Sequence, residues 1–349
     1  MSKRAPTIRD VAICAGVSVA TASNVVNGNR PVGVESRARV SEAIALLGYR
    51  PNRVATALRA RSSRLIGMVV PDITNVFFAG LIHGIEEQAA VSGYDLLLVS
   101  SGEDEATERR RIEALIDRQI DGLLVVPATD GSILPLRDSG RASFMPPTVL
   151  LDRGFGAPGF DSVGAECEAA AYAATRHLIE LGHRDISVLG HSLHQANIRA
   201  RIAGYRRALE EASLGPRARL CIAGHELDSL RGAIEQDLHR TDCSTAIFAL
   251  TNIAALAAIK AARGLGLDIP GEVSIAGFDD FDWMCALRPY LTTVAQPIEE
   301  FASCSWRLLM QRISGVAEPR DIRIELPCTL KVRESTGPAR ARLKAVAGA

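Results

Sequence analysis

One short segment carries side chains that could read the edges of DNA bases. Between Val19 and Asn27 the side chains are small or polar, and none is acidic. On a helix, residues 19, 20, 23, 24 and 27 share one face, opposite an apolar face that contains Ala22, Val25 and Val26. Such a face can enter the major groove, where hydroxyl and amide groups meet base edges. The segment therefore predicts contact with DNA.

The flanking residues predict a helix-turn-helix that would position this face. Thr7 can act as the N-cap of a first helix, whose apolar residues recur at helical spacing. Gly16 tolerates the left-handed backbone that ends a helix, and Ser18 can cap the second helix. An ordinary pair of core helices would give a similar pattern. The next forty residues favour the DNA-binding interpretation.

Those residues add a third helix and a concentration of positive charge. An amphipathic helix is expected over residues 34–47, and residues 52–59 form a short helical segment that needs a partner or DNA for stability. Residues 1–61 hold ten Lys and Arg and three Asp and Glu, a net +7. The remainder holds 30 basic and 37 acidic residues, a net −7. A basic head on an acidic body suggests a polyanion-binding module joined to a domain with another role.

From Arg64 onward, apolar strand patterns alternate with helical patterns. This alternation predicts two doubly wound parallel sheets, the first over about 64–150 and the second over about 163–280. We expect the segment 291–327 to return to the first sheet. Two such lobes enclose a cleft at the carboxyl ends of their strands, where small molecules bind.

Several other classes of protein are disfavoured. The seven cysteines are scattered and form no C-x-x-C, so we expect buried free thiols, no metal site and no cofactor. His191 and His194 form an H-x-x-H, but no nearby Cys or acid completes a metal set. There is no phosphate-binding loop and no G-x-S-x-G. Without a signal core or an apolar run of ~18 residues, the protein is expected to be cytoplasmic.

The order of these patterns resembles the lactose-repressor (LacI/GalR) family of bacterial transcription regulators over about residues 7–335. TIRDVA, GVS and TxSxVVN match within 7–27, and GYxPN and RVAxxL match within 48–58. The core motifs then follow in order: IGMVVPDITNxFF, DGLLVVP, LDR, HLIELGHRDI, RIAGY, VSIAGFDD and LTTVAQP. The resemblance implies an all-α helix-turn-helix head and an α/β core of two doubly wound parallel-sheet lobes, like the periplasmic sugar-binding proteins.

This resemblance also suggests where the domains begin and end. The head would span residues 1–50, and the hinge helix with its linker would span 51–63. The first lobe would comprise 64–162 and 292–335, and the second lobe 163–291. Residues 336–349 would form a disordered tail. Because no leucine heptads follow residue 337, a coiled-coil tetramer is not expected.

For the head, the resemblance implies a homodimer on a pseudo-palindromic operator. Val19, Ala20 and Asn24 would read bases, and Leu58, flanked by Ala55, would wedge into a central minor-groove step. The other DNA contacts, mostly to phosphates, would come from Thr7, Ser18, Thr21, Ser23, Asn27 and Arg53. Many relatives carry Arg or His where this chain has Asn24, so the operator sequence stays open.

For the core, the resemblance implies a sugar site in which aromatic rings cover apolar faces and charged or amide groups hold hydroxyls. The matching positions, each near a strand end, are Asn75, Phe77, Phe78, Asp152, Arg153, Gln195, Arg201, Thr251, Asp279 and Gln296. The two phenylalanines could instead be core residues, and the two arginines could have structural roles. Asp280 is expected to be solvated or to cap.

Departures from the family pattern affect the ligand. Thr251 and Asn252 stand where relatives often carry Asn-Asp, and Val76 replaces the usual Pro before Phe77. The second lobe therefore has the means to read a different group. A neutral sugar is the first interpretation. A nucleoside, a sugar acid or a phosphorylated sugar, acting as corepressor, stays open.

The implied mechanism is allosteric. The ligand would change the relative orientation of the lobes, move the Arg64 ends of the dimer, and order or melt both hinge helices. DNA and ligand would alter each other's affinity by the same free energy, typically ~1–3 kcal/mol. An inducer is favoured over a corepressor, and a sugar-acting enzyme is the remote alternative.

Overall fold

The computed structural model describes residues 6–27, 30–49, 62–135, 145–286, 288–316 and 321–339. The chain divides into two units, Met1–Arg64 and Leu65–Ala349. Most of the expected hinge lies outside the described residues, and with it Arg53, Ala55 and Leu58.

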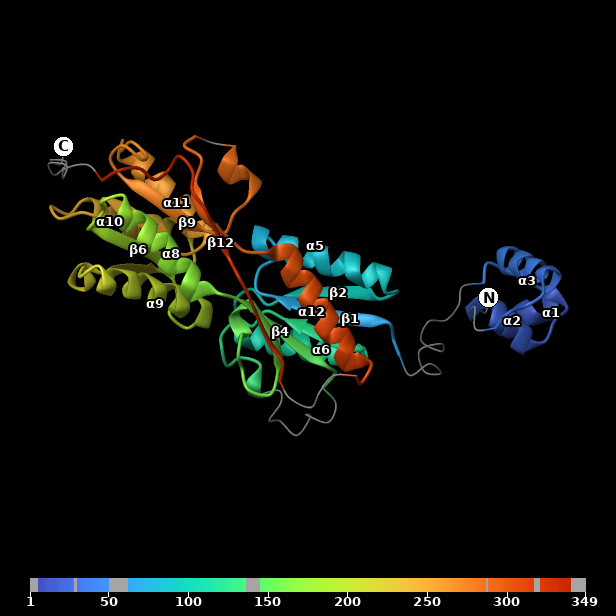
Figure 1. The fold of residues 1–349 in the computed structure, drawn as a ribbon. Coiled ribbons are helices and arrows are strands. Elements are labelled where there is room, and N and C mark those ends of the chain that lie inside the picture. Colours follow the sequence, from blue (N-terminus) through green and yellow to red (C-terminus); the bar gives the residue numbers. More distant parts are fainter. Residues whose placement is uncertain are drawn as a thin grey trace. The chain divides into compact units, whose positions relative to one another are not determined.

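The first unit contains a helix-turn-helix followed by a third helix, as predicted (Figure 1): α1 (Ile8–Ala15), α2 (Val19–Asn27) and α3 (Val34–Leu47). Val11, Ala22 and Val40, one from each helix, are fully buried against one another. Gly16 ends α1 with a φ of 62°, which an L side chain adopts only with strain. The hydroxyl of Ser18 accepts from the N–H of Thr21 at 3.0 Å and so caps α2.

Thr7 is the N-cap of α1, as predicted, and Asp10 completes a capping box with it. The hydroxyl of Thr7 donates to the carboxylate of Asp10 at 2.7 Å. The same carboxylate accepts from the N–H of Thr7, also at 2.7 Å. The acidic side chain in the first turn thus closes the start of the helix, where negative charge is favourable.

The first lobe of the second unit is built on a parallel six-stranded sheet with the order β11-β5-β4-β3-β1-β2. Its strands are β1 (Leu65–Val70), β2 (Asp95–Ser100), β3 (Gly122–Val125), β4 (Thr148–Leu151), β5 (Asp161–Ala165) and β11 (Arg323–Leu326). Its helices are α5 (Val76–Val91), α6 (Glu105–Ile116) and α12 (Ile298–Ile313), and a 3-10 turn, η2 (Asp152–Gly154), follows β4.

Alternate side chains of these strands enter different layers. Met68 and Leu124 pack in the core that α5 and α12 cover, and these two helices lie side by side (Figure 1). Val69 and Leu123 point to the opposite face and pack with Ile112 of α6. This period of two, with both faces apolar, is typical of a parallel sheet covered on both sides.

The second lobe repeats the plan with the order β12-β10-β9-β8-β6-β7, in which only β12 is antiparallel to its neighbour. Its strands are β6 (Ile186–His191), β7 (Arg219–Ala223), β8 (Ala246–Ala249), β9 (Ser274–Phe278), β10 (Thr292–Ala295) and β12 (Thr329–Lys331). Its helices are α8 (Cys167–Glu180), α9 (Ala196–Glu211), α10 (Leu227–Leu238) and α11 (Asn252–Gly264), with 3-10 turns η3 (Gly215–Arg217) and η4 (Asp282–Cys285).

Helices cover both faces of this sheet as well. Val188 and Phe248 pack with residues of α8 and α9, whereas Ile247 and Ile275 pack with α10 and α11. Helices α8 and α9 are in very close contact at Gly204, where a Cβ would collide with the carbonyl oxygen of Glu168. The glycine therefore sets the separation of these two helices.

The expected lobe boundaries need correction at three places. Strand β5 was not expected and belongs to the first sheet, so the second lobe begins at about residue 166 rather than 163. Strand β10 pairs with β9 in the second sheet, so residues 292–295 do not return to the first lobe. Only α12 and β11 do so, and β12 lies again in the second sheet. The chain therefore crosses between lobes three times.

Residues 336–339 do not belong to the expected disordered tail. The carbonyl oxygen of Gly337 lies 3.0 Å from Nε2 of His183, and the N–H of Ala339 donates to the carbonyl of Leu181 at 2.8 Å. These contacts fix residues 336–339 against the second lobe, because they satisfy polar groups at its base. Residues 340–349 lie outside the described residues.

All seven cysteines are free, as expected, but they are not all buried. Cys167 is buried, whereas Cys14 and Cys285 are exposed. Among the described residues, no group of three or more His, Cys, Asp or Glu side chains is arranged to hold a metal ion. In the same part of the chain, no helix has the length and apolar character needed to span a membrane.

Candidate functional site

The DNA-facing side chains predicted on α2 lie at the surface of the first unit. Val19 is 44% exposed, and Ser18 and Ala20 are also exposed. Ser23 and Asn24 are half-buried, as is Thr21, whose hydroxyl lies 2.9 Å from that of Ser18. The side chain of Asn27 is outside the described part of the structure. Helix α2 thus presents a polar face without acidic groups, which suits an approach to phosphates and base edges.

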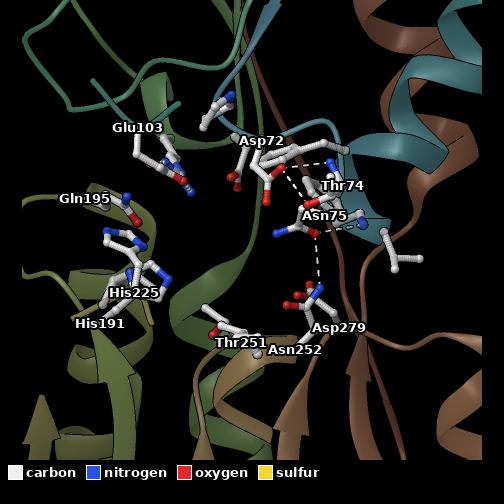
Figure 2. Close-up of a pocket in the computed structure, with 18 of the residues that line it drawn as sticks. Asp72, Thr74, Asn75, Glu103, His191, Gln195, His225, Thr251, Asn252 and Asp279 are labelled. Atoms are coloured by element: carbon white, nitrogen blue, oxygen red, sulfur yellow. Dashed lines mark hydrogen bonds and ion pairs between the residues drawn. The ribbon is translucent and has the colours of Figure 1, made fainter. Parts of the chain in front are cut away.

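The second unit contains a cavity of about 640 Å³ between its two lobes, lined at the carboxyl ends of strands from both sheets. All ten residues that sequence reasoning placed at the ligand site line this cavity: Asn75, Phe77, Phe78, Asp152, Arg153, Gln195, Arg201, Thr251, Asp279 and Gln296. Figure 2 shows the polar groups of the two lobes facing each other across it. Volume and lining suit a small polar ligand.

On the first-lobe wall, Asn75 has two structural contacts. Its side-chain amide oxygen, Oδ1, accepts a hydrogen bond from the N–H of Phe77 at 3.0 Å and so caps α5. The same oxygen accepts from Nδ2 of Asn252 in the second lobe at 3.1 Å (Figure 2). Asn75 therefore links the two lobes at the pocket.

Phe77 and Phe78 serve the core as well as the pocket. They are 4% and 2% exposed, and their ring centroids lie 5.4 Å apart in an edge-to-face arrangement. Phe77 also packs edge-on against Phe301 of α12 at 6.0 Å. The guanidinium of Arg153 lies 5.6 Å from the ring centroid of Phe78. The pair thus forms an apolar floor beneath charged groups.

Arg153 is held by a carboxylate from the neighbouring strand end. Its two terminal nitrogens donate to the two carboxylate oxygens of Glu103, at 2.5 and 2.9 Å. Arg153 is 6% exposed, so this bidentate pair is largely shielded from water. The structural role that sequence reasoning allowed for Arg153 is therefore present alongside its position in the pocket.

Two carboxylates of the first lobe form further polar contacts with the second lobe. The carboxylate of Asp152 accepts from Nδ2 of Asn197 on α9, at 3.0 and 3.2 Å. Asp130, which follows β3, accepts from the N–H of Ala196 at 2.7 Å and pairs with Arg199. These contacts hold the start of α9 against the first lobe, because they satisfy amides at the helix N-terminus.

Arg201 lies deep in the second-lobe wall and is 3% exposed. One of its nitrogens donates to the carbonyl of Leu250 at 2.6 Å, and its guanidinium lies 3.5 Å from the ring centroid of Phe278. Carboxylates of Asp279 and Asp152 supply opposite charge nearby. Arg201 therefore combines an anchor to the second sheet with a place in the pocket.

Asp279 and Asp280, though adjacent, have different environments. Burial raises the pKa of Asp279, although the charge of Arg201 and a 2.6 Å hydrogen bond from Gln296 oppose it. Asp280 is also partly buried, but hydrogen bonds from Arg333, Lys331 and a threonine lower its pKa to about 2. The expectation of a solvated or capping Asp280 is wrong, since it forms ion pairs with Lys331 of β12 and with Arg333, two residues further along the chain.

Thr251 and Asn252 act at the start of α11. The hydroxyl of Thr251 accepts from the N–H of Ala254 at 3.3 Å, which caps the helix. Asn252 reaches across to Asn75. Of these two departures from the family pattern, Thr251 therefore caps a helix and Asn252 links the lobes.

Unpartnered polar atoms are concentrated at this pocket. Of six buried side-chain nitrogen and oxygen atoms without a hydrogen-bond partner in the described residues, four belong to pocket residues. They are Nδ1 of His191, Oε1 of Gln195, Nε of Arg201 and Oε1 of Gln296. Buried polar groups are normally satisfied, so this concentration marks where a ligand would supply partners.

Sequence reasoning did not identify the histidines of the second-lobe wall as pocket residues. The rings of His191 and His225 lie 4.0 Å apart between centroids, and Figure 2 places them beside Gln195. Burial, followed by the charges of His225, Arg153 and Arg201, lowers the pKa of His191 to about 3. His191 is therefore neutral near pH 7, with one nitrogen available to a ligand.

Other lining residues were missed for a similar reason. They include Glu103 and Glu226, which follow strands, Asn197 in the first turn of α9, and Trp283 in the 3-10 turn η4. Position after a strand was the signal that could have found Glu103 and Glu226. The contacts of Glu103 with Arg153 and of Asn197 with Asp152 join residues 50 and 45 positions apart, so no local pattern announces them.

A helix-turn-helix unit and a two-lobed α/β unit with a polar pocket define a DNA-binding regulator with a ligand-binding core. Comparisons with known proteins bear this out. Residues 7–52 match "Bacterial regulatory proteins, lacI family", and residues 175–336 match "Periplasmic binding protein-like domain". Catabolite control protein A of Priestia megaterium is 34% identical over 334 residues, covering 95% of this chain and 99% of that protein. The chain therefore belongs to the lacI family of bacterial transcription regulators.

Solved structures agree with the fold. The lac repressor dimer bound to operator and the anti-inducer ONPF has a TM-score of 0.85 and 26% identity, covering 96% of this chain and all of that one. A LacI family regulator of Enterococcus faecium with bound ribose has a TM-score of 0.71 and 27% identity, covering 79% and 100%. The named relatives are transcriptional regulators and not enzymes. The predictions of family, fold class and regulatory role are confirmed.

Proposed function

We propose that this regulator binds a pseudo-palindromic operator as a homodimer and that a neutral sugar in the interlobe pocket controls its affinity for DNA. The observation that carries the effector assignment is a set of four buried polar atoms around one cavity that have no hydrogen-bond partner within the described ranges. An unsatisfied buried group costs about 1–3 kcal/mol, so a ligand that completes these atoms gains that free energy on binding.

A polyhydroxylated ligand suits the chemistry of these atoms. Each hydroxyl can donate one hydrogen bond and accept others, so it can match the acceptors on Gln195 and Gln296 and the donor on Arg201. Phe78 offers an apolar surface close by. The ribose bound to the Enterococcus faecium relative supports the same ligand class.

The DNA-binding half of the proposal rests on the exposed face of α2. Val19, Ala20 and Asn24 are the base-reading residues we assign. Leu58, with Ala55, is the assigned wedge in the minor groove, outside the described residues. Contacts that position the head on DNA are assigned to Thr7, Ser18, Thr21, Ser23, Asn27 and Arg53. The operator-bound lac repressor dimer supports this arrangement.

Ligand and DNA are coupled through the relative orientation of the lobes. We assign the effector as an inducer, which lowers operator affinity. By linkage, operator DNA must then weaken effector binding by the same factor. Polar contacts that already join the lobes, such as Asn75 with Asn252, are the bonds that such a change must alter.

A thermal-shift screen of the full chain tests the effector. Pentoses, hexoses, sugar acids, sugar phosphates and nucleosides are added in turn to the wild type and to Asp279→Ala. A ligand that binds the native state raises the melting temperature by mass action. The proposal requires a neutral sugar that stabilises the wild type but not the variant. Stabilisation by only nucleosides, acids or phosphates would overturn it.

The operator and the sign of the coupling follow from one further assay. Binding-site selection with the full chain should return a sequence with two inverted half-sites. Affinity for that sequence is then measured with and without the sugar. A single half-site would contradict the dimer, and tighter binding with sugar would contradict the assignment of an inducer.

A further inference from the structure

The pocket carries an excess of negative charge. Among the described residues that line it, five are acidic, two are arginines, and none is lysine. With histidines counted as neutral, the formal net charge is −3. A sugar acid or sugar phosphate would enter against this charge, in a partly shielded site where like charges repel more strongly than in water. The five acidic residues are Asp72, Glu103, Asp152, Glu226 and Asp279.

An anion could still bind if one guanidinium offered it a free pair of donors. At Arg201 one nitrogen is bonded to the carbonyl of Leu250 and Nε has no partner among the described residues. The carboxylates of Asp279 and Asp152 balance its charge, so Arg201 offers a ligand a donor without a net positive charge. Arg153 is the other guanidinium, and its planar pair of nitrogens has the geometry that suits a carboxylate or phosphate. Whether these two nitrogens of Arg153 are already hydrogen-bonded therefore decides whether the pocket accepts an anionic ligand.

Glu103 already occupies that pair of donors. Both of its oxygens are bonded to Arg153, at 2.5 and 2.9 Å, and the guanidinium lies over Phe78. Arg153 is 6% exposed and Glu103 27%, so the carboxylate is the more accessible of the two groups. A ligand carboxylate would have to displace a carboxylate of equal charge that is covalently part of the wall.

The backbone at Glu103 supports a specific role for this side chain. Its φ is 62°, in the left-handed region where glycine is favoured and other residues cost on the order of 1 kcal/mol. Asp152 and Asp279, also in the pocket, share this strain, with φ of 51° and 74°. Glycine would relieve the strain at residue 103 but would leave Arg153 without its partner.

We propose that Glu103 makes the pocket selective for uncharged polyhydroxyl compounds, because it occupies the guanidinium of Arg153 and so excludes sugar acids and sugar phosphates. This inference rests on the proposed function of the pocket as the effector site. It narrows the effector class and names the residue that sets the limit.

The test compares matched neutral and acidic probes on the full chain. Ribose, glucose and galactose are paired with ribose 5-phosphate, glucuronate and galacturonate, and sodium sulfate serves as a general oxyanion. Affinities are measured by titration calorimetry and thermal shift for the wild type, Glu103→Gln and Glu103→Gly. We expect both variants to improve the affinity for acidic probes and sulfate, relative to neutral sugars, by at least about tenfold.

Two controls separate a freed guanidinium from a change in overall charge. Glu226→Gln removes one negative charge from the second-lobe wall of the same pocket, and its gain for acids should be several-fold smaller. The double variant Glu103→Gln/Arg153→Gln has no guanidinium to free, so its affinity for sulfate should return to the wild-type value. Glu103→Gly guards against misfolding, since it also relieves the backbone.

The outcomes distinguish this inference from the proposed function. If neutral sugars bind the wild type but acids bind equally well, or if Glu226→Gln gains as much as Glu103→Gln, the role of Glu103 is refuted and the sugar site stands. If neither kind of sugar binds any of the proteins, the effector class itself is wrong and the inference falls with it. The affinity for sulfate shows whether the guanidinium of Arg153 is free to bind an oxyanion, and this measurement does not require the effector to be known.

Discussion

The two walls of the pocket satisfy their polar groups in different ways. On the first-lobe wall, Arg153 is paired with Glu103, and Asp152 accepts from Asn197. On the second-lobe wall and the crossing beside it, four buried atoms have no partner among the described residues: Nδ1 of His191, Oε1 of Gln195, Nε of Arg201 and Oε1 of Gln296. In the function that we propose, the first wall is preorganised and sets what is excluded, whereas the second is completed by the ligand and sets what is bound.

The largest effect should come from Arg201, which belongs to the second wall but also anchors it. Arg201→Met leaves the buried carboxylate of Asp279 without its cation and the carbonyl of Leu250 without a donor. We expect a loss of about 3–5 kcal/mol in the free energy of unfolding, measured by urea denaturation. Arg207 lies on the same helix as Arg201 and forms an exposed ion pair with Glu168 of α8, so Arg207→Met should cost less than about 1 kcal/mol. Equal losses would mean that Arg201 has no anchoring role.

Gln195 should show that stability and binding oppose each other on the second wall. Gln195→Met replaces an unpaired buried acceptor with an apolar side chain of similar size. We expect the unliganded protein to be at least as stable as the wild type, while affinity for the effector falls about tenfold or more. Asn197→Leu, two residues along, leaves Asp152 without this donor and should instead lose about 1–3 kcal/mol of stability. If both variants lose stability, the comparison between the walls fails.

His191 should make stability depend on pH. Its pKa is lowered from 6.5 to about 3 in the folded state, so between these values the unfolded chain binds the extra proton. Stability is therefore lost as pH falls from about 6.5 towards 3, by up to about 1.4 kcal/mol per pH unit for this group. His191→Gln should reduce that slope without abolishing it, because burial also lowers the pKa of His177 and His183.

The measurement is urea denaturation at a series of pH values. His194→Gln removes an exposed histidine three residues away and serves as the matched control. An unchanged slope in His191→Gln would show that His191 is not held neutral by the second wall.

The smallest effect is a spectroscopic one. The chain has two tryptophans, of which Trp283 lines the pocket and Trp306 is 5% exposed with its indole N–H bonded to Ser92. Binding of the effector should change the emission of the wild type and of Trp306→Phe, but not that of Trp283→Phe. The converse result would place the ligand away from the second-lobe wall.

Much of the fold was predictable because its signals are local. Helix caps at Ser18, the break at Gly16 and the apolar runs of β1 and β3 are each encoded within a few residues. The sheet to which a strand belongs is not encoded in this way. Strand β10 looks the same in sequence whether it pairs with β9 or in the first sheet, and only the long-range register decides.

For the candidate site, too, local signals were predictable from the sequence and long-range contacts were not. The strand-end positions, together with the family resemblance, placed ten residues around the pocket. They could not show that Glu103 is bonded to Arg153, or that Oε1 of Gln195 has no hydrogen-bond partner in the part of the chain that the structure describes. Both facts depend on which chain segments meet in space. The sequence patterns therefore predicted where the pocket lies, but not which hydrogen bonds its individual atoms form.

The late edge strands also bear on how the protein forms during synthesis. Strand β11 completes the first sheet beside β5, and the N–H of Ile322 donates to Asp161, 161 residues earlier. Strand β12 completes the second sheet beside β10. A ribosome must therefore pass residue 326 before the first lobe has all its strands, and residue 331 before the second lobe does. A chain that stops short of residue 323 would expose an open edge on both sheets at once, and such edges invite aggregation.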